Sequence, residues 1–168
     1  MGLQQHREQG QGRSLNFAVV TVSDTRRGDQ DTGGAYLVEA LEAAGHRVVQ
    51  RAWVSDDGAQ ILEQARACVQ QEEVQVVLFT GGTGLALRDV TADVLGEFFD
   101  SSIPGFGELF RQLSYQEIGP ATILSRACAG VSARKLVCAL PGSPKALRLA
   151  MEKILLPECG HIVAQLQG

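Results

Sequence analysis

Strand patterns and helix patterns alternate along the first half of the chain, and this alternation restricts the fold more than any other feature. Asn16–Val22, Arg47–Val54 and Val74–Thr80 are rich in apolar and β-branched residues, and each predicts a strand. The third is almost entirely apolar, which is typical of a parallel strand covered on both faces. Strand-then-helix units in series require right-handed crossovers, so the pattern predicts an α/β fold built on a layered sheet.

Apolar residues at helical spacing predict the connecting helices. Ala35–Ala44 forms one apolar face and ends at Gly45, and a second helix turns Ile61, Leu62, Ala65 and Val69 inward. The second half of the chain is less regular. It predicts short helices at Ala92–Phe99 and Gly107–Leu113, separated by a break at Ile103–Gly105. Strands are predicted at Thr122–Ala129 and Lys135–Leu140, with Gly130 between them. A helix is predicted to begin at Ser143-Pro144 and to stop before Pro157, and a final helical segment carries Ile162, Val163 and Leu166.

Length, composition and charge limit the classes of function. The 168 residues, 45% hydrophobic and 20% charged, fit one globular domain, which we place at residues 15–168 behind a flexible N-terminal tail, residues 1–14. No apolar run approaches the roughly 20 residues that cross a bilayer, and the N-terminus lacks a secretory signal, so we expect a cytoplasmic protein without a membrane partner. A net charge of −4 argues against a nucleic-acid partner. The four scattered cysteines are expected to be small buried hydrophobes.

A glycine-rich loop follows the third strand directly, at the sheet edge where open α/β folds bind ligands. The segment Thr80-Gly81-Gly82-Thr83-Gly84 removes Cβ atoms where the backbone approaches another group, and it permits positive φ, so that successive N–H groups can converge on an anion. A tight turn with close strand–helix packing would need the same glycines. The loop alone does not decide between these two interpretations.

Acidic and basic residues stand beside this loop and after the second strand. Arg88 can pair with a phosphate and Asp89 can hold Mg²⁺, although Asp89 or Thr91 could instead cap the following helix. Asp56, in Ser55-Asp56-Asp57, supplies a second carboxylate at the same edge, where the alternative is again helix capping. Two carboxylates that face one cleft predict a magnesium–phosphate site.

Further polar loops belong to the same predicted cleft. The segment Leu140-Pro141-Gly142-Ser143-Pro144-Lys145 presents a helix N-terminus, which is either an anion site or plain helix initiation. Ser125-Arg126 lies near the start of a predicted strand, and Ser23-Asp24-Thr25-Arg26 follows the first strand. Together with the glycine loop, these segments predict a cleft for phosphates and a metal ion.

These motifs in combination resemble the signature of the molybdenum-cofactor biosynthesis protein B and molybdopterin adenylyltransferase family. The resemblance runs through Thr80–Gly84 and Arg88-Asp89-Val90-Thr91 to Pro104-Gly105-Phe106-Gly107-Glu108, Ser125-Arg126-Ala127 and Leu140–Pro144, and it includes Val22-Ser23-Asp24 and Asp31–Gly34. It covers about Phe17 to the C-terminus.

The resemblance implies a three-layer αβα fold with a mostly parallel central sheet, and an enzyme that uses Mg-ATP to adenylylate the terminal phosphate of molybdopterin. Asp56 and Asp89 match the family's two acidic residues, so it implies that they are catalytic and hold Mg²⁺. The other candidate substrate-binding residues are Ser23, Asp24, Thr80, Gly81, Gly82, Thr83, Gly84, Arg88, Ser125, Arg126, Pro141, Gly142 and Ser143, and we place Ser125, Arg126 and Pro141–Ser143 on the pterin side. The departures lie in Ser55-Asp56-Asp57, where the adenylyltransferase branch has Pro-Asp-Glu, and in two stretches after Gly107 that lean toward the protein B branch.

Those departures leave two functional alternatives to adenylyl transfer, a non-catalytic molybdopterin scaffold and a nucleotide-responsive regulator. The resemblance also implies a homotrimer or hexamer, with the molybdenum-inserting enzyme as a partner that receives the product. Pro104–Leu113 carries Phe106, Leu109, Phe110 and Leu113, which would either form an assembly surface or pack on the chain's own sheet.

Overall fold

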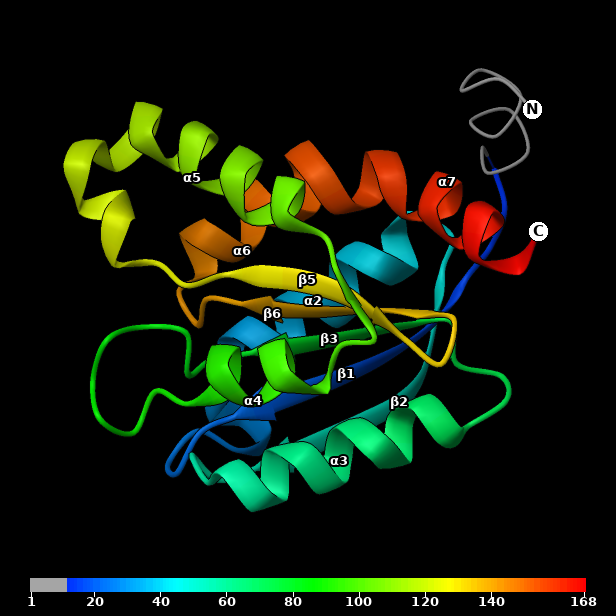
Figure 1. Cartoon of the computed structure of the whole chain (residues 1–168), viewed down its shortest axis with the longest axis horizontal. Coiled ribbons are helices and arrows are strands. Elements are labelled where there is room, and N and C mark those ends of the chain that lie inside the picture. Colours follow the sequence, from blue (N-terminus) through cyan, green and yellow to red (C-terminus); the bar gives the residue numbers. More distant parts are fainter. Residues whose placement is uncertain (1–11) are drawn as a thin grey trace.

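Six strands form one mixed sheet at the centre of the protein, in the order β2-β1-β3-β6-β5-β4 (Figure 1). The computed structural model describes residues 12–168. The strands are β1 (Asn16–Val22), β2 (Arg47–Val54), β3 (Val76–Thr80), β4 (Ser101–Ser102), β5 (Cys128–Ser132) and β6 (Lys135–Leu140). β2, β1, β3 and β6 pair in parallel, whereas β5 and β4 are antiparallel to their neighbours. The predicted α/β fold with a mostly parallel sheet is confirmed.

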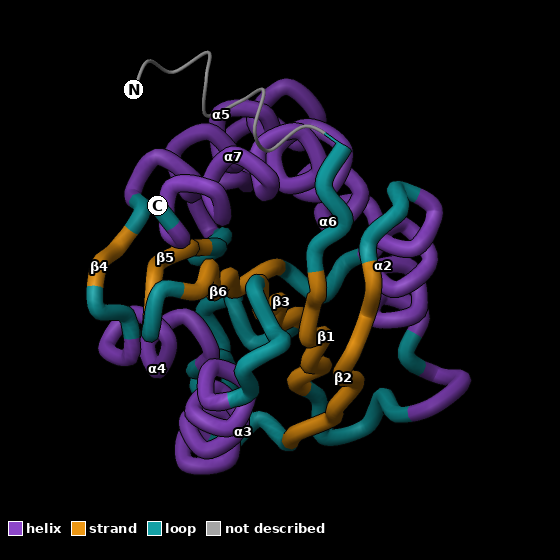
Figure 2. The backbone as a smooth tube through the Cα atoms, turned by 90° about the vertical axis from the view of Figure 1, so that its right-hand side faces the viewer, coloured by secondary structure: helices purple, strands orange, loops and turns teal. Residues whose placement is uncertain are grey.

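Helices cover both faces of the sheet, which confirms the three-layer arrangement (Figure 2). The α-helices are α2 (Thr32–Ala43), α3 (Gly58–Gln70), α4 (Thr91–Phe98), α5 (Pro104–Ile118), α6 (Pro144–Ala150) and α7 (Leu156–Gln167); η1 (Gly28–Gln30) and η2 (Gly119–Leu124) are 3₁₀ turns, and η3 (Met151–Leu155) is a π turn. α2, α5, α6 and α7 lie on one face, and α3 and α4 lie on the other. β1 shows why both faces are apolar, since Phe17 and Val19 pack into one core while Ala18 and Val20 pack into the other.

The strand predicted at Thr122–Ala129 is wrong except at its last two residues. Thr122 and Leu124 belong to the η2 turn, and strand pairing begins only at Cys128. Gly119, with φ of +62°, ends α5, and the Thr122 hydroxyl donates to Arg111 O at 3.2 Å, which holds the turn against that helix. A long-range contact therefore overrides the local preference of Thr and Ile for strands.

The hairpin between β5 and β6 also turns at a different place from the one predicted. Gly130 lies inside β5, where a Cβ would overlap the Phe99 ring. Ala133 and Arg134 make the turn instead, with φ of 50° and 60°. The Asp100 carboxylate accepts a hydrogen bond from Ala133 N at 2.8 Å and stabilises this left-handed geometry.

Two prolines act at helix starts rather than at breaks. Pro104 occupies the first turn of α5, so this helix is longer than the predicted Gly107–Leu113. Pro157 does not stop the C-terminal helix. The preceding π turn bonds Leu156 N to Met151 O, and Pro157 then falls in the first turn of α7, where its missing N–H is tolerated.

Some expectations concern the chain termini and the cysteines. Residues 1–11 lie outside the described residues, so the flexible tail and the domain boundary stay predictions. Cys68, Cys138 and Cys159 are buried as expected, and Cys128 is partly buried. Within residues 12–168, no helix combines the length and the apolar character that crossing a membrane requires.

Candidate functional site

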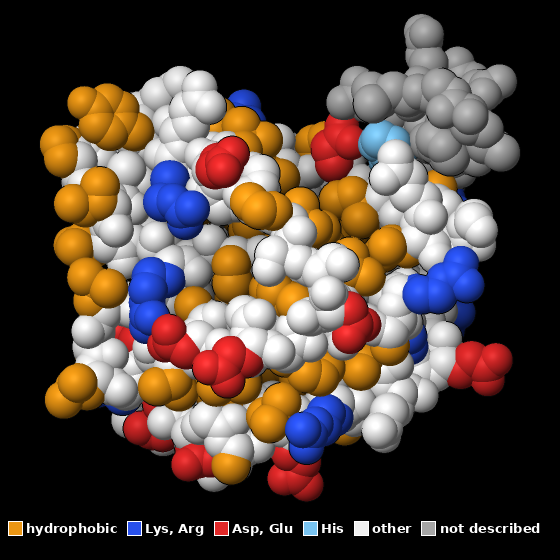
Figure 3. Space-filling model, viewed as in Figure 1, with side chains coloured by type: hydrophobic (Ala, Val, Ile, Leu, Met, Phe, Trp, Pro, Cys, Tyr) orange, Lys and Arg blue, Asp and Glu red, His pale blue; other side chains and the backbone are white. Residues whose placement is uncertain are grey.

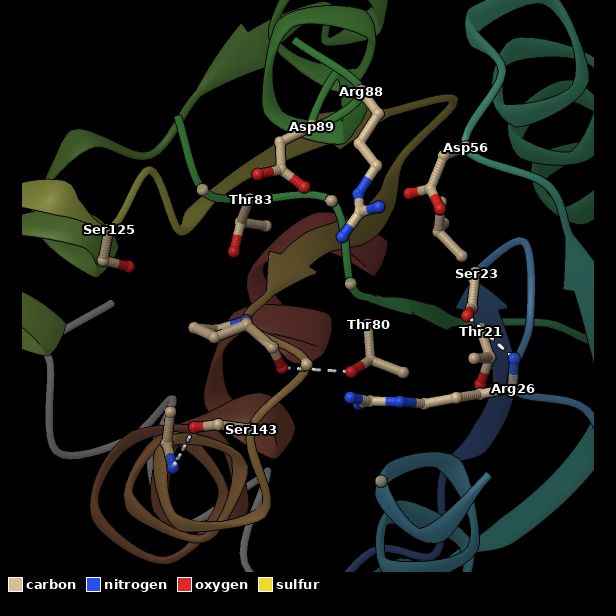
Figure 4. A pocket seen from close by; sticks show the side chains of 18 of the residues that line it. Thr21, Ser23, Arg26, Asp56, Thr80, Thr83, Arg88, Asp89, Ser125 and Ser143 are labelled. Carbon is tan, nitrogen blue, oxygen red and sulfur yellow. Dashed lines mark hydrogen bonds between the residues drawn. The ribbon is translucent and has the colours of Figure 1, made fainter. Parts of the chain in front are cut away.

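A cavity of about 510 Å³ opens at the carboxyl ends of the parallel strands (Figure 4). Its volume falls within the roughly 300–1,000 Å³ that small-molecule sites occupy. Predicted residues that line it are Ser23, Asp24, Asp56, Thr80, Gly81, Gly82, Thr83, Gly84, Arg88, Asp89, Ser125, Pro141, Gly142 and Ser143. Arg126 is the one predicted site residue that does not line the cavity. Loops from β1, β2, β3 and β6 thus converge at one edge of the sheet, where the sequence placed them.

The glycine loop after β3 serves both of the purposes that its sequence left open. Gly81 and Gly82 have φ of +104° and +69°, and a Cβ there would overlap Val22 O or the Thr91 hydroxyl, so close packing requires both glycines. Gly81 N donates to Leu140 O at 3.0 Å, and its amide is therefore occupied. The amides of Gly82, Thr83 and Gly84 have no hydrogen-bond acceptor within residues 12–168. Three N–H groups remain available to an anion.

The two aspartates after β2 have separate roles. The Asp57 carboxylate caps α3 by accepting from Gln60 N at 2.9 Å, as the capping alternative expects. Asp56 instead faces the cavity. Its backbone N donates to Asp24 Oδ1 at 3.0 Å, and its Oδ2 accepts from Asp24 N at 3.1 Å. This reciprocal pair joins the loop after β1 to the loop after β2.

Asp89 does not cap the helix that follows it. The N-cap of α4 is Val90, which makes no side-chain hydrogen bond. Asp89 Oδ2 accepts from Ala86 N at 3.0 Å within its own loop, and Asp89 lines the same cavity as Asp56. The capping alternative for Asp89 is therefore wrong.

The carboxylates of this cavity influence one another. Burial raises the pKa of Asp56 above its ordinary value; the hydrogen bond from the Asp24 backbone lowers this pKa, and the negative charge of Asp24 raises it. Arg88 lowers the pKa of Asp56, and Asp89 raises it further. Figure 4 shows the Arg88 guanidinium between the Asp89 and Asp56 carboxylates, so this rim of the cavity carries both negative and positive charge.

The two carboxylates at this rim fit a magnesium ion that substrate phosphates would complete. No three His, Cys, Asp or Glu side chains are arranged as metal ligands in the part of the chain that the structure describes. Magnesium, however, commonly uses only one or two carboxylates and takes its remaining oxygens from phosphates and water. Asp56 and Asp89 are the residues that would hold it.

Two arginines bring positive charge to the cavity. Arg88 lies beside Asp89, and Arg26 extends across the cavity near Thr80 (Figure 4). Neither arginine forms an ion pair within residues 12–168. Arg26 was not singled out at the sequence level because it stands in a polar loop, where a solvated side chain is the ordinary expectation.

The loop after β6 initiates a helix and lines the cavity. Ser143 caps α6 by accepting from Ala146 N at 3.2 Å, which confirms the predicted helix start. The Thr80 hydroxyl donates to Pro141 O at 3.0 Å, so this loop is tied to the end of β3. Gly33 of α2 packs against it, since a Cβ on Gly33 would lie 3.3 Å from Gly142 O.

One wall of the cavity was not predicted from the sequence. Phe110, Ser114 and Ile118 of α5 line it together with Thr122 and Leu124 of η2. The sequence predicts either an assembly surface or packing on the chain's own sheet for Phe110, and a strand for Thr122, so neither pattern points to a ligand. This wall places apolar carbon opposite the charged loops.

Comparison with known proteins agrees with the fold. A family model described as a probable molybdopterin binding domain matches residues 18–161. Molybdenum cofactor biosynthesis protein B of Halalkalibacterium halodurans is 42% identical over 167 residues, covering 99% of this chain and 98% of the relative. The fold and the match define an α/β domain of the type that this family model describes.

Solved structures identify the family more closely. A crystal structure of molybdenum cofactor biosynthesis protein B superposes with a TM-score of 0.90 at 46% identity, covering 92% of this chain and 97% of that one. The tungsten cofactor synthesizing protein MoaB from Pyrococcus furiosus superposes with a TM-score of 0.83 at 33% identity, covering 93% and 99% of the two chains. The chain belongs to the family of molybdenum cofactor biosynthesis protein B.

Proposed function

We propose that this protein binds molybdopterin and adenylylates its terminal phosphate with Mg-ATP, releasing pyrophosphate. The observation that carries the proposal is that Asp56 and Asp89 face one cavity together with three loop amides and two arginine side chains that have no partner among residues 12–168. A site for two polyanions and a cation needs this combination, because carboxylates attract the metal ion while amides and guanidinium groups bind phosphates.

The reaction forms one P–O bond and breaks another. A terminal phosphate oxygen of molybdopterin attacks the α-phosphorus of ATP, and the bond from that phosphorus to the oxygen bridging to the β-phosphate breaks, so pyrophosphate leaves with the electron pair. The attacking phosphate is already ionised at neutral pH, so the protein needs no strong general base. Its main task is to align the two anions in line.

Each wall of the cavity has a role in that alignment. The amides of Gly82, Thr83 and Gly84 would hold one phosphoryl group, and Arg88 would offset charge on the non-bridging oxygens. A magnesium ion at Asp56 and Asp89 would supply the remaining neutralisation of the triphosphate. Ser125, Pro141, Gly142 and Ser143 would bind the molybdopterin side, where Phe110 and Ile118 offer apolar contact to a planar ring.

Pyrophosphate release tests this proposal. The wild type, Asp56→Asn and Asp89→Asn would each be mixed with Mg-ATP, with and without molybdopterin. We expect molybdopterin-dependent release from the wild type alone, with both variants near background. Equal background release from all three proteins, with molybdopterin binding retained, would favour the non-catalytic scaffold. ATP binding without any response to molybdopterin would favour a nucleotide-responsive regulator.

We also propose the homotrimer that the family resemblance implies, and the molybdenum-inserting enzyme as recipient of the product. Phe106 and Phe110 are buried, so they pack on the chain's own sheet and do not form an assembly surface. Exposed apolar side chains lie instead at Leu85, Leu87, Leu109, Tyr115, Ile118, Ile123 and Leu124. Figure 3 shows hydrophobic side chains along the left of the molecule, where Figure 1 places η2 and the loop before α4. A monomer in light scattering at micromolar concentration would contradict the trimer.

A further inference from the structure

Arg126 stands between η2 and β5, next to the cavity residue Ser125, but it does not itself line the cavity. Three of its groups bond to the loop that connects β3 to α4. Its backbone N donates to Thr83 O at 3.0 Å, its Nε donates to Gly84 O at 2.9 Å, and its Nη2 donates to Asp89 O. The Arg126 side chain therefore bridges the two ends of the segment Gly84–Asp89.

The remaining nitrogen of the guanidinium is fixed as well. Nη1 lies 2.7 and 2.8 Å from the two carboxylate oxygens of Asp93, in the first turn of α4. Asp93 is 57% exposed, so this ion pair by itself contributes little to stability. Its effect is to orient the guanidinium plane toward the two carbonyl groups.

The bridged segment contains both charged residues of this part of the site. Between Gly84 and Asp89, Ala86 N donates to Asp89 Oδ2 at 3.0 Å and Asp89 N donates to Ala86 O at 2.8 Å. A Cβ on Gly84 would lie 2.7 Å from Asp89 Oδ2, so the carboxylate packs directly on the start of the segment. The position of the Asp89 carboxylate thus depends on how closely the two ends are held together.

We propose that Arg126 is a positioning residue that closes the Gly84–Asp89 loop and thereby places Asp89 and Arg88 for the metal–phosphate site. The inference rests on the proposed function for its consequence in Mg-ATP binding, and on the geometry alone for its effect on the loop. Arginine is required because its planar fork sends separate donors to Gly84 O, Asp89 O and Asp93. A lysine has one ammonium centre and cannot reach all three partners.

Arg126→Lys tests the proposal in the full-length chain without any ligand. We expect amide hydrogen exchange at Ala86 and Asp89 to accelerate by about tenfold, since both amides are protected only within the closed loop. Amides of β1 and β3 should exchange at the wild-type rate. Unchanged exchange at Ala86 and Asp89 would overturn the proposal.

Calorimetric titration with Mg-ATP supplies the second readout. We expect the dissociation constant to rise about tenfold in Arg126→Lys, an effect that a second-layer residue can have on a metal site. A weaker affinity with wild-type exchange at Ala86 and Asp89 would instead make Arg126 a direct ligand contact and overturn the positioning role. If exchange at Ala86 and Asp89 is faster in Arg126→Lys but the wild type shows no adenylyl transfer, the positioning role stands and the proposed function is wrong.

Two further variants keep the test interpretable. Asp93→Asn removes only the orienting ion pair, and we expect it to move both readouts in the same direction by a smaller factor. Arg134→Lys is the matched control, because Arg134 Nε also donates to a main-chain carbonyl, Leu166 O at 2.8 Å, but contacts none of the cavity residues. Its loop exchange and its Mg-ATP affinity should equal those of the wild type, and equal losses in both lysine variants would overturn the proposal.

Discussion

Asp31 and Asp56 both line the cavity, yet their hydrogen bonds differ fundamentally. Asp31 accepts from Thr21 Oγ1 at 2.7 Å, Trp53 Nε1 at 2.9 Å, Gly34 N at 2.9 Å and the Arg51 guanidinium. Asp56 accepts one backbone N–H, from Asp24 at 3.1 Å, and lies among further negative charges.

The contrast separates a structural carboxylate from one available to a ligand. Asp31 is 4% exposed and has a donor at every side, so a ligand could reach it only by displacing protein groups. Asp56 has few donors and keeps an oxygen for the cavity. The number of donors around each carboxylate therefore assigns the roles, although both residues are aspartates at the same edge of the sheet.

The largest effect should come from removing the charge of Asp31. In Asp31→Asn, the Arg51 guanidinium keeps its burial but loses its counter-charge, which should lower the free energy of unfolding by about 3 kcal/mol. Chemical denaturation measures this change. Asp57→Ala, which removes the exposed cap of α3, is the control and should cost only about 1 kcal/mol. A similar loss in the free energy of unfolding for the two variants would contradict the structural role of Asp31.

Changes at Asp56 and Asp89 should affect activity instead of folding. Asp56→Asn and Asp89→Asn should each lower kcat for pyrophosphate release by at least about 100-fold, the scale on which one electrostatic group contributes to a reaction. Their melting temperatures should equal or exceed that of the wild type, because each substitution relieves repulsion among the carboxylates. A melting temperature well below wild type would place Asp56 in the same structural class as Asp31.

The pH dependence of stability sharpens the comparison further. The pKa of Asp56 is raised in the folded protein, mainly by burial. Between its ordinary and its raised pKa the folded state holds more protons than the unfolded state, so the contribution of Asp56 to stability falls as pH increases through that window. NMR titration of the Asp56 carboxyl carbon should show a raised pKa that decreases in Asp89→Asn. An unchanged pKa in that variant would mean that the two carboxylates do not interact.

The smallest expected effect concerns a hydroxyl beneath the glycine loop. Thr91 Oγ1 is the one buried side-chain polar atom without a hydrogen-bond partner among residues 12–168. Thr91→Val should therefore stabilise the protein slightly, by up to about 1 kcal/mol. Thr122→Val is the control and should destabilise it, because the Thr122 hydroxyl donates to Arg111 O at 3.2 Å. Thermal denaturation of both variants shows whether each is more or less stable than the wild type.

Local patterns were sufficient to predict the charged half of the site. The glycine loop, Asp56 and the Ser143 cap follow β3, β2 and β6, Asp89 comes after the glycine loop, and the parallel sheet brings these positions together. The bounds of β1, β2 and β6 were also predicted, because apolar and β-branched residues predominate in each segment.

The apolar half and the positioning residues could not be predicted in this way. Phe110 and Ile118 follow an ordinary helical pattern, and only the packing of α5 against the sheet brings that face to the cavity. Arg126 sits in a family-like motif, which suggested a ligand contact, whereas the partners of its guanidinium are 33 to 42 residues away in sequence. Hydrogen bonds across such separations leave no periodic signal in one sequence.

The bond between Trp53 and Asp31 gives the molecule an internal optical probe. Trp53 is the single tryptophan of the chain, and its indole N–H donates to a carboxylate that borders the cavity. Indole emission responds to the electric field and hydration near the ring nitrogen, so a ligand that fills the cavity should shift the emission maximum or change the intensity. Titrations could then be followed in unlabelled protein by light alone.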